Sequence, residues 1–413
     1  MQQRIRIKIP DAGKVDWTAL RNEPHFLYRR VADQDRAVLG VGLSRAVEEP
    51  IFDPDNRATD WYFGALRYEW KDALEPALGH AAKIHEAAHC EWFVPRFVVE
   101  WQGKDVVMHV LPGEEADARA WAEVFFAPCL SAISDPPKEW LEQCDRTSYL
   151  VQVGVLMRHI QRGDIYELNY CTARTAHCPS FDPFASFGKL LVNSGAPYAG
   201  FHRSGNNFAL CASPERFLRF EKDRVVGQPM KGTRPRSPDP MEDVRLRDEL
   251  AADVKERSEN VMALDVMRHD LSKVAASGSV HVEELCAVIT VPRVHQMIST
   301  VSARLRDGNT PMDAVRAAFP MASMTGAPKV RAMQLIDEAE GAPRGLFSGS
   351  LGFFAPDGTG DLNVVIRTLL FDALTGNASI HTGSAITALC DPEQEWEECQ
   401  LKARSVIDAL GHA

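Results

Sequence analysis

The order of strand-like and helix-like segments constrains the fold of this chain more than any other feature. Residues 4–9 (RIRIKI) alternate between polar and apolar side chains, which predicts a half-buried strand. Residues 97–110 predict a hairpin, because two apolar runs flank the short polar segment QGK. Further along, strand-like runs follow one another directly instead of alternating one for one with helices. This order favours antiparallel sheets with helices packed outside them, an α+β fold.

One segment of the chain is rich in residues that break helices and strands, residues 134–140 (SDPPKEW). A predicted helix precedes this segment, and a second helix, capped by Thr147 or Ser148, follows it. The 413 residues suit two modest domains or one large one. We therefore expect an N-terminal part, residues 1–140, and a C-terminal part, residues 141–413.

Charge and cysteine content narrow the class of protein. The net charge of −11 disfavours nucleic acid or an acidic membrane surface as a partner, because both are polyanions. The nine cysteines are odd in number and contain no C-x-x-C pair, which favours reduced thiols in a cytoplasmic protein. The N-terminus does not resemble a signal peptide, and no run of 18 apolar residues predicts a membrane-spanning helix.

Two predicted helices each carry two glutamates three residues apart, which places each pair on one helix face. The first helix, residues 241–275, contains Glu256 and Glu259, and the last helix of the chain contains Glu395 and Glu398. Four carboxylates from two helices could surround one hard divalent cation, and oxygen ligands favour Mg²⁺. The alternative is that each pair is a solvated helix face.

The segment GQPMKGTRPR (227–236) predicts irregular backbone flanked by cations. Around Gly232 and Thr233, such a loop can present N–H groups and positive charge to a carboxylate. Lys231 is a nucleophile only when neutral, so its pKa would have to fall below the usual value of about 10.4. Burial and the neighbouring arginines would lower this pKa. The alternative is an exposed lysine in a turn.

Three further positions carry possible chemistry. Glu215, in SPERF, could act as a general acid if it is desolvated, or it could be a surface carboxylate or a helix cap. Arg367 ends the apolar segment LNVVIRT and needs a buried partner, either a substrate carboxylate or a structural salt bridge. The segment SMTGAPK, with Pro328, could bind an anion or simply begin a helix.

Nine segments, taken together and in their order along the chain, resemble those of the chorismate-utilising enzymes. This family includes the large subunits of anthranilate synthase and aminodeoxychorismate synthase, and the isochorismate and salicylate synthases. The resemblance covers roughly residues 145–410, with a weaker match at FGALRYEW. The matching segments are GDIYELNY, SPERF, PMKGTRPR, KERSENVMALDVMRHDLSKV, SMTGAPKVRAM, RGLFSGSLGF, VVIRT, HTGSAIT and DPEQEWEECQLKA.

The resemblance implies two large antiparallel sheets with helices outside and an active site between the sheets. It implies that Glu215 is the general acid that helps the C4 hydroxyl of chorismate to leave. It also implies which residues bind Mg²⁺, some of them through a water molecule, and which groups bind the substrate, some of them from the backbone. The Mg²⁺ ligands would be Glu256, Glu259, Glu395 and Glu398, and the groups binding the substrate carboxylates would be Arg367, Lys402 and the HTGSA turn with Gly383, Ser384 and Ala385.

Lys231 separates the branches of the family. Members that form anthranilate or isochorismate typically have alanine there, whereas the branch that aminates chorismate at C4 has lysine. In that branch the lysine is thought to add at C2 while the C4 hydroxyl leaves, after which ammonia adds at C4 and expels it. The resemblance therefore implies the conversion of chorismate and ammonia to 4-amino-4-deoxychorismate, a precursor of 4-aminobenzoate and folate.

The ammonia would come from glutamine through a separate glutaminase subunit, because no G-x-C-x-G nucleophile turn occurs in the chain. The alternatives are an anthranilate synthase large subunit and a non-catalytic subunit with the same fold. Four positions depart from the family pattern. Glu167 stands where Gln or Lys is usual, Gln296 where His is expected, Phe347 where Tyr is expected, and Ala385 where Gly is expected. Glu167 disfavours an isochorismate synthase, since it supplies no lysine base.

Overall fold

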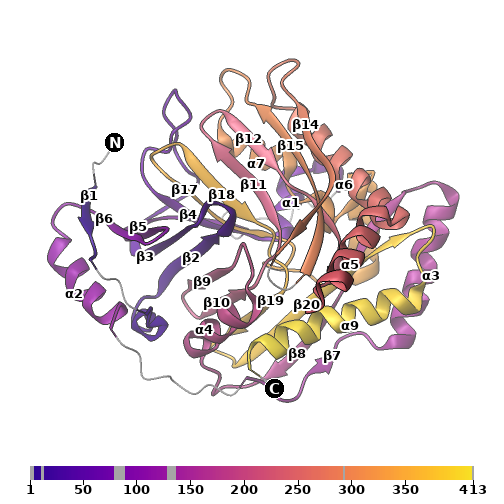
Figure 1. Cartoon of the computed structure of the whole chain (residues 1–413), viewed down its shortest axis with the longest axis horizontal. Helices are drawn as coiled ribbons and strands as arrows, with labels where there is room; N and C mark the ends of the chain where they lie inside the picture. The colour runs from indigo at the N-terminus through magenta and orange to yellow at the C-terminus, as the bar shows by residue number, and fades with distance from the viewer. Residues whose placement is uncertain (1–3, 11–13, 79–88, 128–135, 292–293, 412–413) are drawn as a thin grey trace.

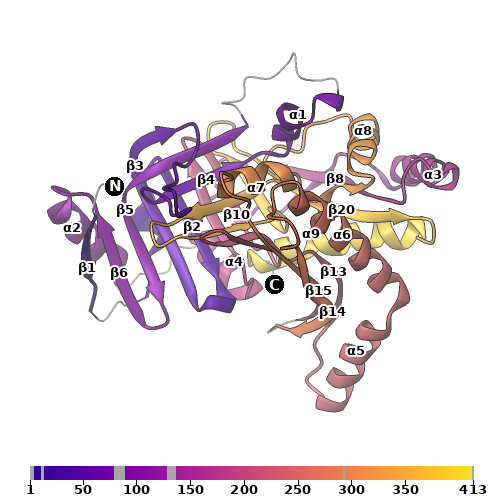
Figure 2. The same ribbon diagram turned by 90° about the horizontal axis from the view of Figure 1, so that it is seen from above.

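The computed structural model describes residues 4–10, 14–78, 89–127, 136–291 and 294–411. Its strands pair antiparallel throughout and form two large sheets (Figure 1). Some pairings join strands that are consecutive in the chain, such as β5 and β6, and others join strands that are far apart in it, such as β8 and β20. The architecture is the predicted α+β fold, with helices outside the sheets (Figures 1 and 2).

The first sheet contains the strand that carries the HTGSA segment. That strand is β20. In hydrogen-bonding order, the sheet consists of β7 (Leu141–Glu142), β8 (Glu167–His177), β20 (Asn377–Thr387), β19 (Thr368–Asp372), β10 (Asn207–Cys211), β9 (Gly200–Ser204), β2 (His25–Val31), β3 (Arg36–Val47), β5 (Cys90–Gln102), β6 (Asp105–Val110) and β1 (Ile5–Lys8). The two-residue strand β16 (Gly326–Ala327) also pairs with β8.

The second sheet begins on the same long strand, β5. The first residues of β5 pair with β4, whereas its last residues pair with β6. From β4 (Tyr62–Leu66) the order continues through β17 (Ser350–Phe354), β18 (Thr359–Asn363), β11 (Arg216–Glu221), β12 (Arg224–Gly227) and β15 (Val294–Arg304), which also pairs with β13 (Met230–Pro235) and β14 (His281–Thr290). Strand β5 therefore links the two sheets into one hydrogen-bonded network.

An apolar layer lies between the sheets. Leu27 and Val38 of the first sheet and Phe63 and Phe353 of the second belong to one cluster of buried side chains. The rings of Phe63 and Phe353 lie 6.0 Å apart, centroid to centroid. Because alternate side chains of each strand face this layer, both sheets bury one face against the other.

The helices cover the outer faces. Apolar side chains of α4 (Pro183–Ser194) and α9 (Pro392–Ala409) pack with those of the first sheet, and so do those of α2 (Glu115–Phe125). α6 (Val254–Ser272) and α7 (Pro311–Ala318) pack with the second sheet. α3 (Arg146–Arg162) and α8 (Lys329–Glu340) pack together near β8, and the remaining helices are α1 (Lys71–Leu74) and α5 (Pro240–Ala252).

Two sequence-based expectations about helices are wrong. The single helix expected over residues 241–275 is two helices, broken at Asp253, whose extended backbone and side chain cap α6 by accepting a hydrogen bond from the Glu256 N–H. The helix expected to begin at Thr147 or Ser148 begins earlier, because Asp145 is its cap. Part of the breaker segment 134–140 lies outside the described residues.

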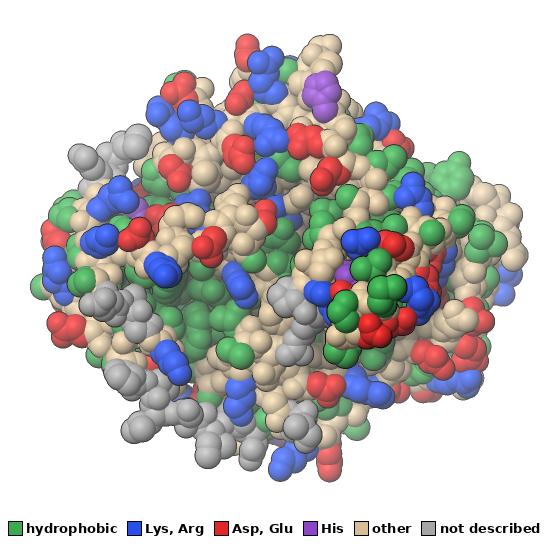
Figure 3. Space-filling view, in the orientation of Figure 1, with side chains coloured by type: hydrophobic (Ala, Val, Ile, Leu, Met, Phe, Trp, Pro, Cys, Tyr) green, Lys and Arg blue, Asp and Glu red, His purple; other side chains and the backbone are tan. Residues whose placement is uncertain are grey.

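In the described part of the chain, no helix combines the length and the apolarity needed to cross a membrane. On the face seen in Figure 3, acidic and basic side chains are intermingled.

Candidate active site

A cavity of about 590 Å³ collects the candidate residues from distant parts of the sequence. Its volume lies in the range of small-molecule sites. Strand β13 contributes one wall, helices α6 and α9 contribute another, and β20 contributes the floor. Of the candidate residues, all except Ser384 line it: Glu215, Lys231, Gly232, Thr233, Glu256, Glu259, Arg367, Gly383, Ala385, Glu395, Glu398 and Lys402.

The HTGSA segment lies inside strand β20 and is not a turn. β20 pairs with β8 over its whole length, so successive side chains point to opposite faces. The Ser384 side chain therefore points away from the cavity, and its Oγ lies 2.8 Å from the hydroxyl of Tyr149. Gly383 faces the cavity side, where a Cβ atom would lie 2.2 Å from Asn169 Oδ1. Only glycine fits there without a shift of the Asn169 and Cys171 side chains.

Three of the four glutamates on α6 and α9 lie against lysines, and the fourth, Glu256, lies 3.6 Å from Arg234. Lys255 Nζ lies 2.9 Å from Glu395 Oε1 and 3.9 Å from Glu259 Oε1. Lys402 Nζ lies 2.6 Å from Glu398 Oε1 and also donates to the Gly383 carbonyl (2.7 Å). Burial raises the pKa of Glu259 to about 7. In this arrangement cationic side chains of this chain lie against all four carboxyl groups.

The donor atoms around α6 and α9 suit a hard divalent cation by their chemistry. Glu259 Oε1 is buried and has no hydrogen-bond partner. Among the described residues, however, no three or more His, Cys, Asp or Glu side chains lie close enough together to hold a metal ion. Binding of a cation would therefore require the glutamates to converge and Lys255 to withdraw.

Lys231 is buried between two carboxylates. Its Nζ donates to Glu167 Oε1 (2.6 Å) and lies 3.8 Å from Glu259 Oε2. Burial alone would lower the pKa of Lys231, but the charges of Glu167 and Glu259 outweigh it and raise the pKa above its usual value. The lowered pKa expected from the sequence is therefore wrong for this state of the site.

The neighbouring arginines do not oppose the charge on Lys231, contrary to the sequence-based expectation. Arg234 is paired with Asp253 (2.7 Å), and Arg236 is paired with Asp243 (2.8 Å). Arg234 also lies 3.6 Å from Glu256, so carboxylates hold both guanidinium groups, and neither arginine is among the main causes of the raised pKa of Lys231.

Glu215 lies in the connection between β10 and β11 and is 4% exposed. Burial raises the pKa of its carboxyl group to about 7. The alternative of a surface carboxylate is therefore wrong. A carboxyl group with this pKa holds a proton in a substantial fraction of molecules near neutral pH, so it can donate one to a ligand.

Arg367 lies between β18 and β19, with a left-handed backbone (φ 52°). Burial lowers the pKa of its guanidinium group, which donates to Ser405 Oγ (2.6 Å). In the described part of the chain, no carboxylate lies within ion-pair distance of Arg367. The expectation that Arg367 forms a structural salt bridge is therefore wrong. Its guanidinium group is available to an anionic ligand in the cavity.

The four departures from the family pattern occupy different places. Glu167 is the partner of Lys231, and Ala385 lines the cavity. The ring of Phe347 stacks on that of His381 with centroids 5.3 Å apart. Gln296 lies outside this cavity, in the wall of an adjoining cavity of about 460 Å³, and its Oε1 is buried without a hydrogen-bond partner.

Sequence reasoning missed several residues of the cavity wall. Lys255 stands four residues before Glu259 on α6, so helical spacing could have identified it. Asn169, Ser323 and His381 also line the cavity; they lie in the segments GDIYELNY, SMTGAPK and HTGSAIT, which the sequence analysis singled out without assigning a role to these three residues. Ser405 lines the cavity through tertiary packing, for which the sequence carried no signal.

With this geometry in hand, comparison with known proteins identifies the family. Residues 28–408 match the family described as chorismate binding enzyme. The chain belongs to this family.

Individual relatives carry several names. Aminodeoxychorismate synthase from Streptomyces griseus is 41% identical over 85% of this chain and 50% of that protein, so the chain spans about half the length of this relative. Anthranilate synthase component 1 from Thermus thermophilus is 38% identical over 74% of this chain and 68% of that protein. The menaquinone-specific isochorismate synthase from Escherichia coli has a TM-score of 0.78 at 18% identity, covering 98% of this chain and 94% of that one, which confirms the fold.

Proposed function

We propose that this chain is the chorismate-aminating component of an aminodeoxychorismate synthase, converting chorismate and ammonia to 4-amino-4-deoxychorismate. The observation that carries the proposal is Lys231, which lines the same cavity as Glu215 and Arg367. The 41% identity to the Streptomyces griseus aminodeoxychorismate synthase supports it. All of the proposed site residues belong to residues 141–413, which we regard as the chorismate-binding part.

Chorismate is a ring with two carboxylates, and the cavity offers separate positive groups for them. Arg367 has no carboxylate partner within the described residues, so it suits one substrate carboxylate. Lys402, the backbone around Gly383 and Ala385, and the N–H groups of Gly232 and Thr233 suit polar groups at the other end. Mg²⁺ would be held by Glu256, Glu259, Glu395 and Glu398. When bound, it would supply positive charge that balances a ring carboxylate.

The covalent steps use Lys231 and two carboxyl groups. Lys231 first gives a proton to Glu167. Its neutral Nζ then forms a bond to C2, the ring double bond shifts, and the C4–O bond breaks. Glu215 supplies the proton with which the hydroxyl leaves as water. Ammonia then forms a bond to C4, the double bond shifts back, and the C2–N bond breaks. The amine of Lys231 is restored, and the carboxylate of Glu215 takes the surplus proton from the new ammonium group.

The ammonia would come from a glutamine amidotransferase partner. The Streptomyces griseus relative is about twice as long as the segment matched here, and no glutaminase nucleophile motif occurs in this chain. We therefore expect the isolated chain to use ammonium salts but not glutamine.

A second candidate is anthranilate synthase component I, which the 38% identity to the Thermus thermophilus protein favours. The third is a non-catalytic subunit, for which the changed residues Gln296, Phe347 and Ala385 are the argument. The two enzymatic candidates differ in the carbon that is aminated, so the product separates them.

Product identity tests the proposal. The purified chain is incubated with chorismate, Mg²⁺ and an ammonium salt at alkaline pH, and the products are separated and identified by mass and absorbance. We expect 4-amino-4-deoxychorismate with ammonium and no turnover with glutamine alone. Anthranilate would favour the second candidate, and no product under any nitrogen source would favour the third.

A further inference from the structure

Arg344 is a buried cation behind the wall of the active-site cavity. It is 3% exposed, and all five N–H groups of its guanidinium donate hydrogen bonds. Two of them reach the carboxylate of Glu340 on α8 (2.8 and 2.6 Å). The other three reach the carbonyl of Met324 (2.7 Å), Oγ of Ser348 (3.1 Å) and the carbonyl of Asn169 (2.9 Å). Because the guanidinium is planar and rigid, it fixes these acceptors relative to one another.

The acceptors of Arg344 belong to three different walls of the active site. Asn169 and Met324 line the cavity themselves, and Ser348 follows Phe347, which also lines it. The first two walls are joined a second time, because Nδ2 of Asn169 donates to the carbonyl of Ser323 (3.3 Å). One buried cation therefore holds together three segments that are distant in the sequence and that meet around the substrate cavity.

These walls carry polar side chains close to the proposed chemistry. Burial raises the pKa of Glu215, and the hydroxyl of Ser323 opposes this rise, so Ser323 lies near the proposed general acid. The Asn169 side chain lines the same cavity. Catalytic groups must be held within about 0.5 Å of their productive geometry. A small shift of these walls would therefore slow the chemical steps more than it would weaken substrate binding.

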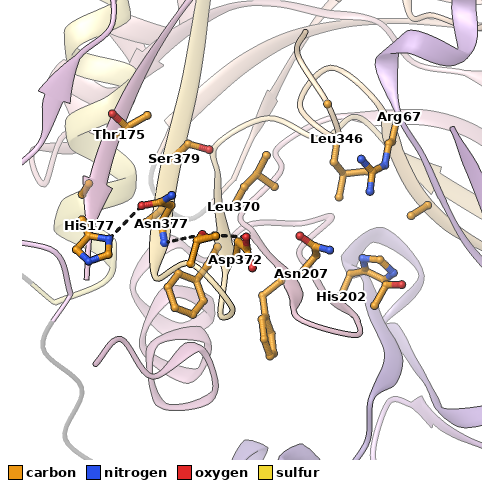
Figure 4. A pocket seen from close by; sticks show the side chains of 18 of the residues that line it. Arg67, Thr175, His177, His202, Asn207, Leu346, Leu370, Asp372, Asn377 and Ser379 are labelled. Atoms are coloured by element: carbon orange, nitrogen blue, oxygen red, sulfur yellow. Dashed lines mark hydrogen bonds between the residues drawn. The ribbon is translucent and has the colours of Figure 1, made fainter. Parts of the chain in front are cut away.

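The segment FGALRYEW, which has no role in the steps above, holds Arg344 from the other side. Oε1 of Glu69 accepts hydrogen bonds from the backbone N–H groups of Arg344 (2.7 Å) and of the next residue (3.1 Å). The guanidinium also lies over the ring of Tyr68, 4.4 Å from its centroid, in a cation–π contact. The two segments stay together beyond this contact, where Arg67 and Leu346 line one wall of a further cavity (Figure 4). The N-terminal part of the chain thus supports the active site through Arg344.

Arg344 also fixes both ends of a bend that carries an active-site side chain. Gly345 and Ser348 have left-handed backbone (φ 63° and 62°), so the chain turns sharply on each side of Leu346 and Phe347. The backbone of Arg344 precedes the bend, and its side chain holds Ser348 at the other end. The Phe347 ring is therefore carried by a short segment that is anchored on both sides.

We propose that Arg344 is a positioning residue, which holds three walls of the cavity in the arrangement in which Lys231 attacks C2 and Glu215 delivers its proton. This inference deepens the proposed function and rests on it. Lysine cannot take the place of Arg344, because its three N–H groups lie on one atom and cannot reach acceptors on several sides. A role in stability alone would need only a cation paired with Glu340.

The test compares two buried arginines with the same kinds of partner. Arg344 and Arg29 each donate to two backbone carbonyls and to one carboxylate, but Arg29 and its partner Asp361 do not line the cavity. For Arg344→Lys we expect kcat to fall about 100-fold, the cost of a misplacement of about 1 Å. The KM for chorismate should stay within about threefold of wild type, because Arg367 and Lys402 are untouched. Arg29→Lys should lower stability but keep both constants within about threefold.

Glu69→Ala is a milder second variant. It releases the backbone of Arg344 and leaves the guanidinium and every side chain of the cavity in place. We expect kcat to fall about fivefold or more, with the KM for chorismate within about threefold of wild type. This variant decides the question if Arg344→Lys does not fold.

Circular dichroism and thermal unfolding establish that each variant is folded before its kinetics are read. A folded Arg344→Lys variant whose kcat stays within about threefold of wild type would overturn the proposal, and so would an equal loss of kcat in Arg29→Lys. If Arg344→Lys does not fold, wild-type kcat in Glu69→Ala overturns it. Failure of the wild-type chain to form any 4-aminated product would instead sink the proposed function, so the two failures are distinguishable.

Discussion

At the scale of single residues, the contact between Lys231 and Glu167 determines how the proposed nucleophile is held before substrate arrives. The two side chains are 64 positions apart in the sequence and meet at 2.6 Å. Glu167 is buried, and its second oxygen, Oε2, has no hydrogen-bond partner. A lysine held in this way is positioned but protonated, so the arrival of substrate and metal must change its surroundings before it can attack.

Replacement of Lys231 tests whether it attacks or only pairs with a carboxylate. Lys231→Ala should lower kcat by about 100-fold or more, the scale on which a covalent catalyst is lost, with chorismate still bound. Lys231→Arg should not rescue activity, because guanidinium stays protonated and cannot form the bond to C2. Intact-mass spectrometry of wild type with chorismate and no ammonia should detect an adduct on Lys231. An active Lys231→Arg variant together with no adduct would favour a purely electrostatic role.

Glu215 gives the reaction a pH dependence with a defined sign. Its pKa is raised to about 7, so the proton that it donates is present below that pH and is lost above it. At a fixed concentration of free ammonia, kcat/KM for chorismate should therefore fall as the pH rises through about 7, because this constant reports the pKa values of the free enzyme. Glu215→Gln should lower kcat by roughly 100-fold and remove this limb of the profile. A Glu215→Gln profile that kept the same limb would assign the titration to another group.

At the scale of elements, α6 and α9 meet through their glutamates and lysines. Lys255 of α6 reaches Glu395 of α9, and Lys402 holds Glu398 within α9. Like charges on the two helix faces would repel if these lysines moved away, and a divalent cation would offset that repulsion. The two helices thus form the part of the site whose charge balance a metal would change most.

Magnesium binding tests this interface directly. Exhaustive chelation should abolish turnover, and Mg²⁺ should restore it. In calorimetric titrations with chorismate present, Glu259→Gln and Glu398→Gln should weaken Mg²⁺ binding by about tenfold or more, since each removes a charged ligand. The matched control is Glu242→Gln on α5, whose carboxylate pairs with Arg245 at the surface. Full activity without divalent cations would refute the assignment.

The elements also show what the sequence could and could not predict. Periodicity correctly put Glu256 with Glu259 and Glu395 with Glu398 on single helix faces, because helical spacing is a local property. The break at Asp253 was missed, although Asp253 followed by Glu256 is a helix-start pattern. The Glu167–Lys231 contact was not predictable, because it depends on how β8 and β13 are brought together. The same holds for the burial of Glu215 and the lack of an ion-pair partner for Arg367.

At the scale of the whole molecule, a buried ionic network connects the two sheets. Arg29 of β2 donates to Asp361 of β18 (2.7 Å), and Arg216 of β11 donates to the other oxygen of Asp361 (2.8 Å). Arg29 and Asp361 are 332 positions apart, and neither is exposed to solvent by more than 1%. Arg216 also pairs with Asp33 (2.6 Å), so removal of the Asp361 charge would leave Arg216 with one carboxylate partner and the buried Arg29 without its ion-pair partner.

Asp361→Asn should therefore destabilise the whole protein. We expect the free energy of unfolding to fall by about 3 kcal/mol, the usual cost of breaking a buried pair on one side. The control is Asp357→Asn, because that aspartate is exposed and lies 3.6 Å from Arg36, and it should change stability by less than about 1 kcal/mol. Urea unfolding followed by circular dichroism measures both. Equal stability of the two variants would contradict a structural role for the network.

The strand β5, which hydrogen-bonds to β4 near its start and to β6 near its end, has a consequence for motion. Proteins that close over a ligand by hinge bending need two bodies joined by a few residues with free backbone angles. Here one continuous ladder of backbone hydrogen bonds runs from one body into the other, so bending would break paired strands. Opening and closing of the site therefore falls to side chains and short connections, such as Lys255 and the bend from Gly345 to Ser348, while the framework around them stays fixed.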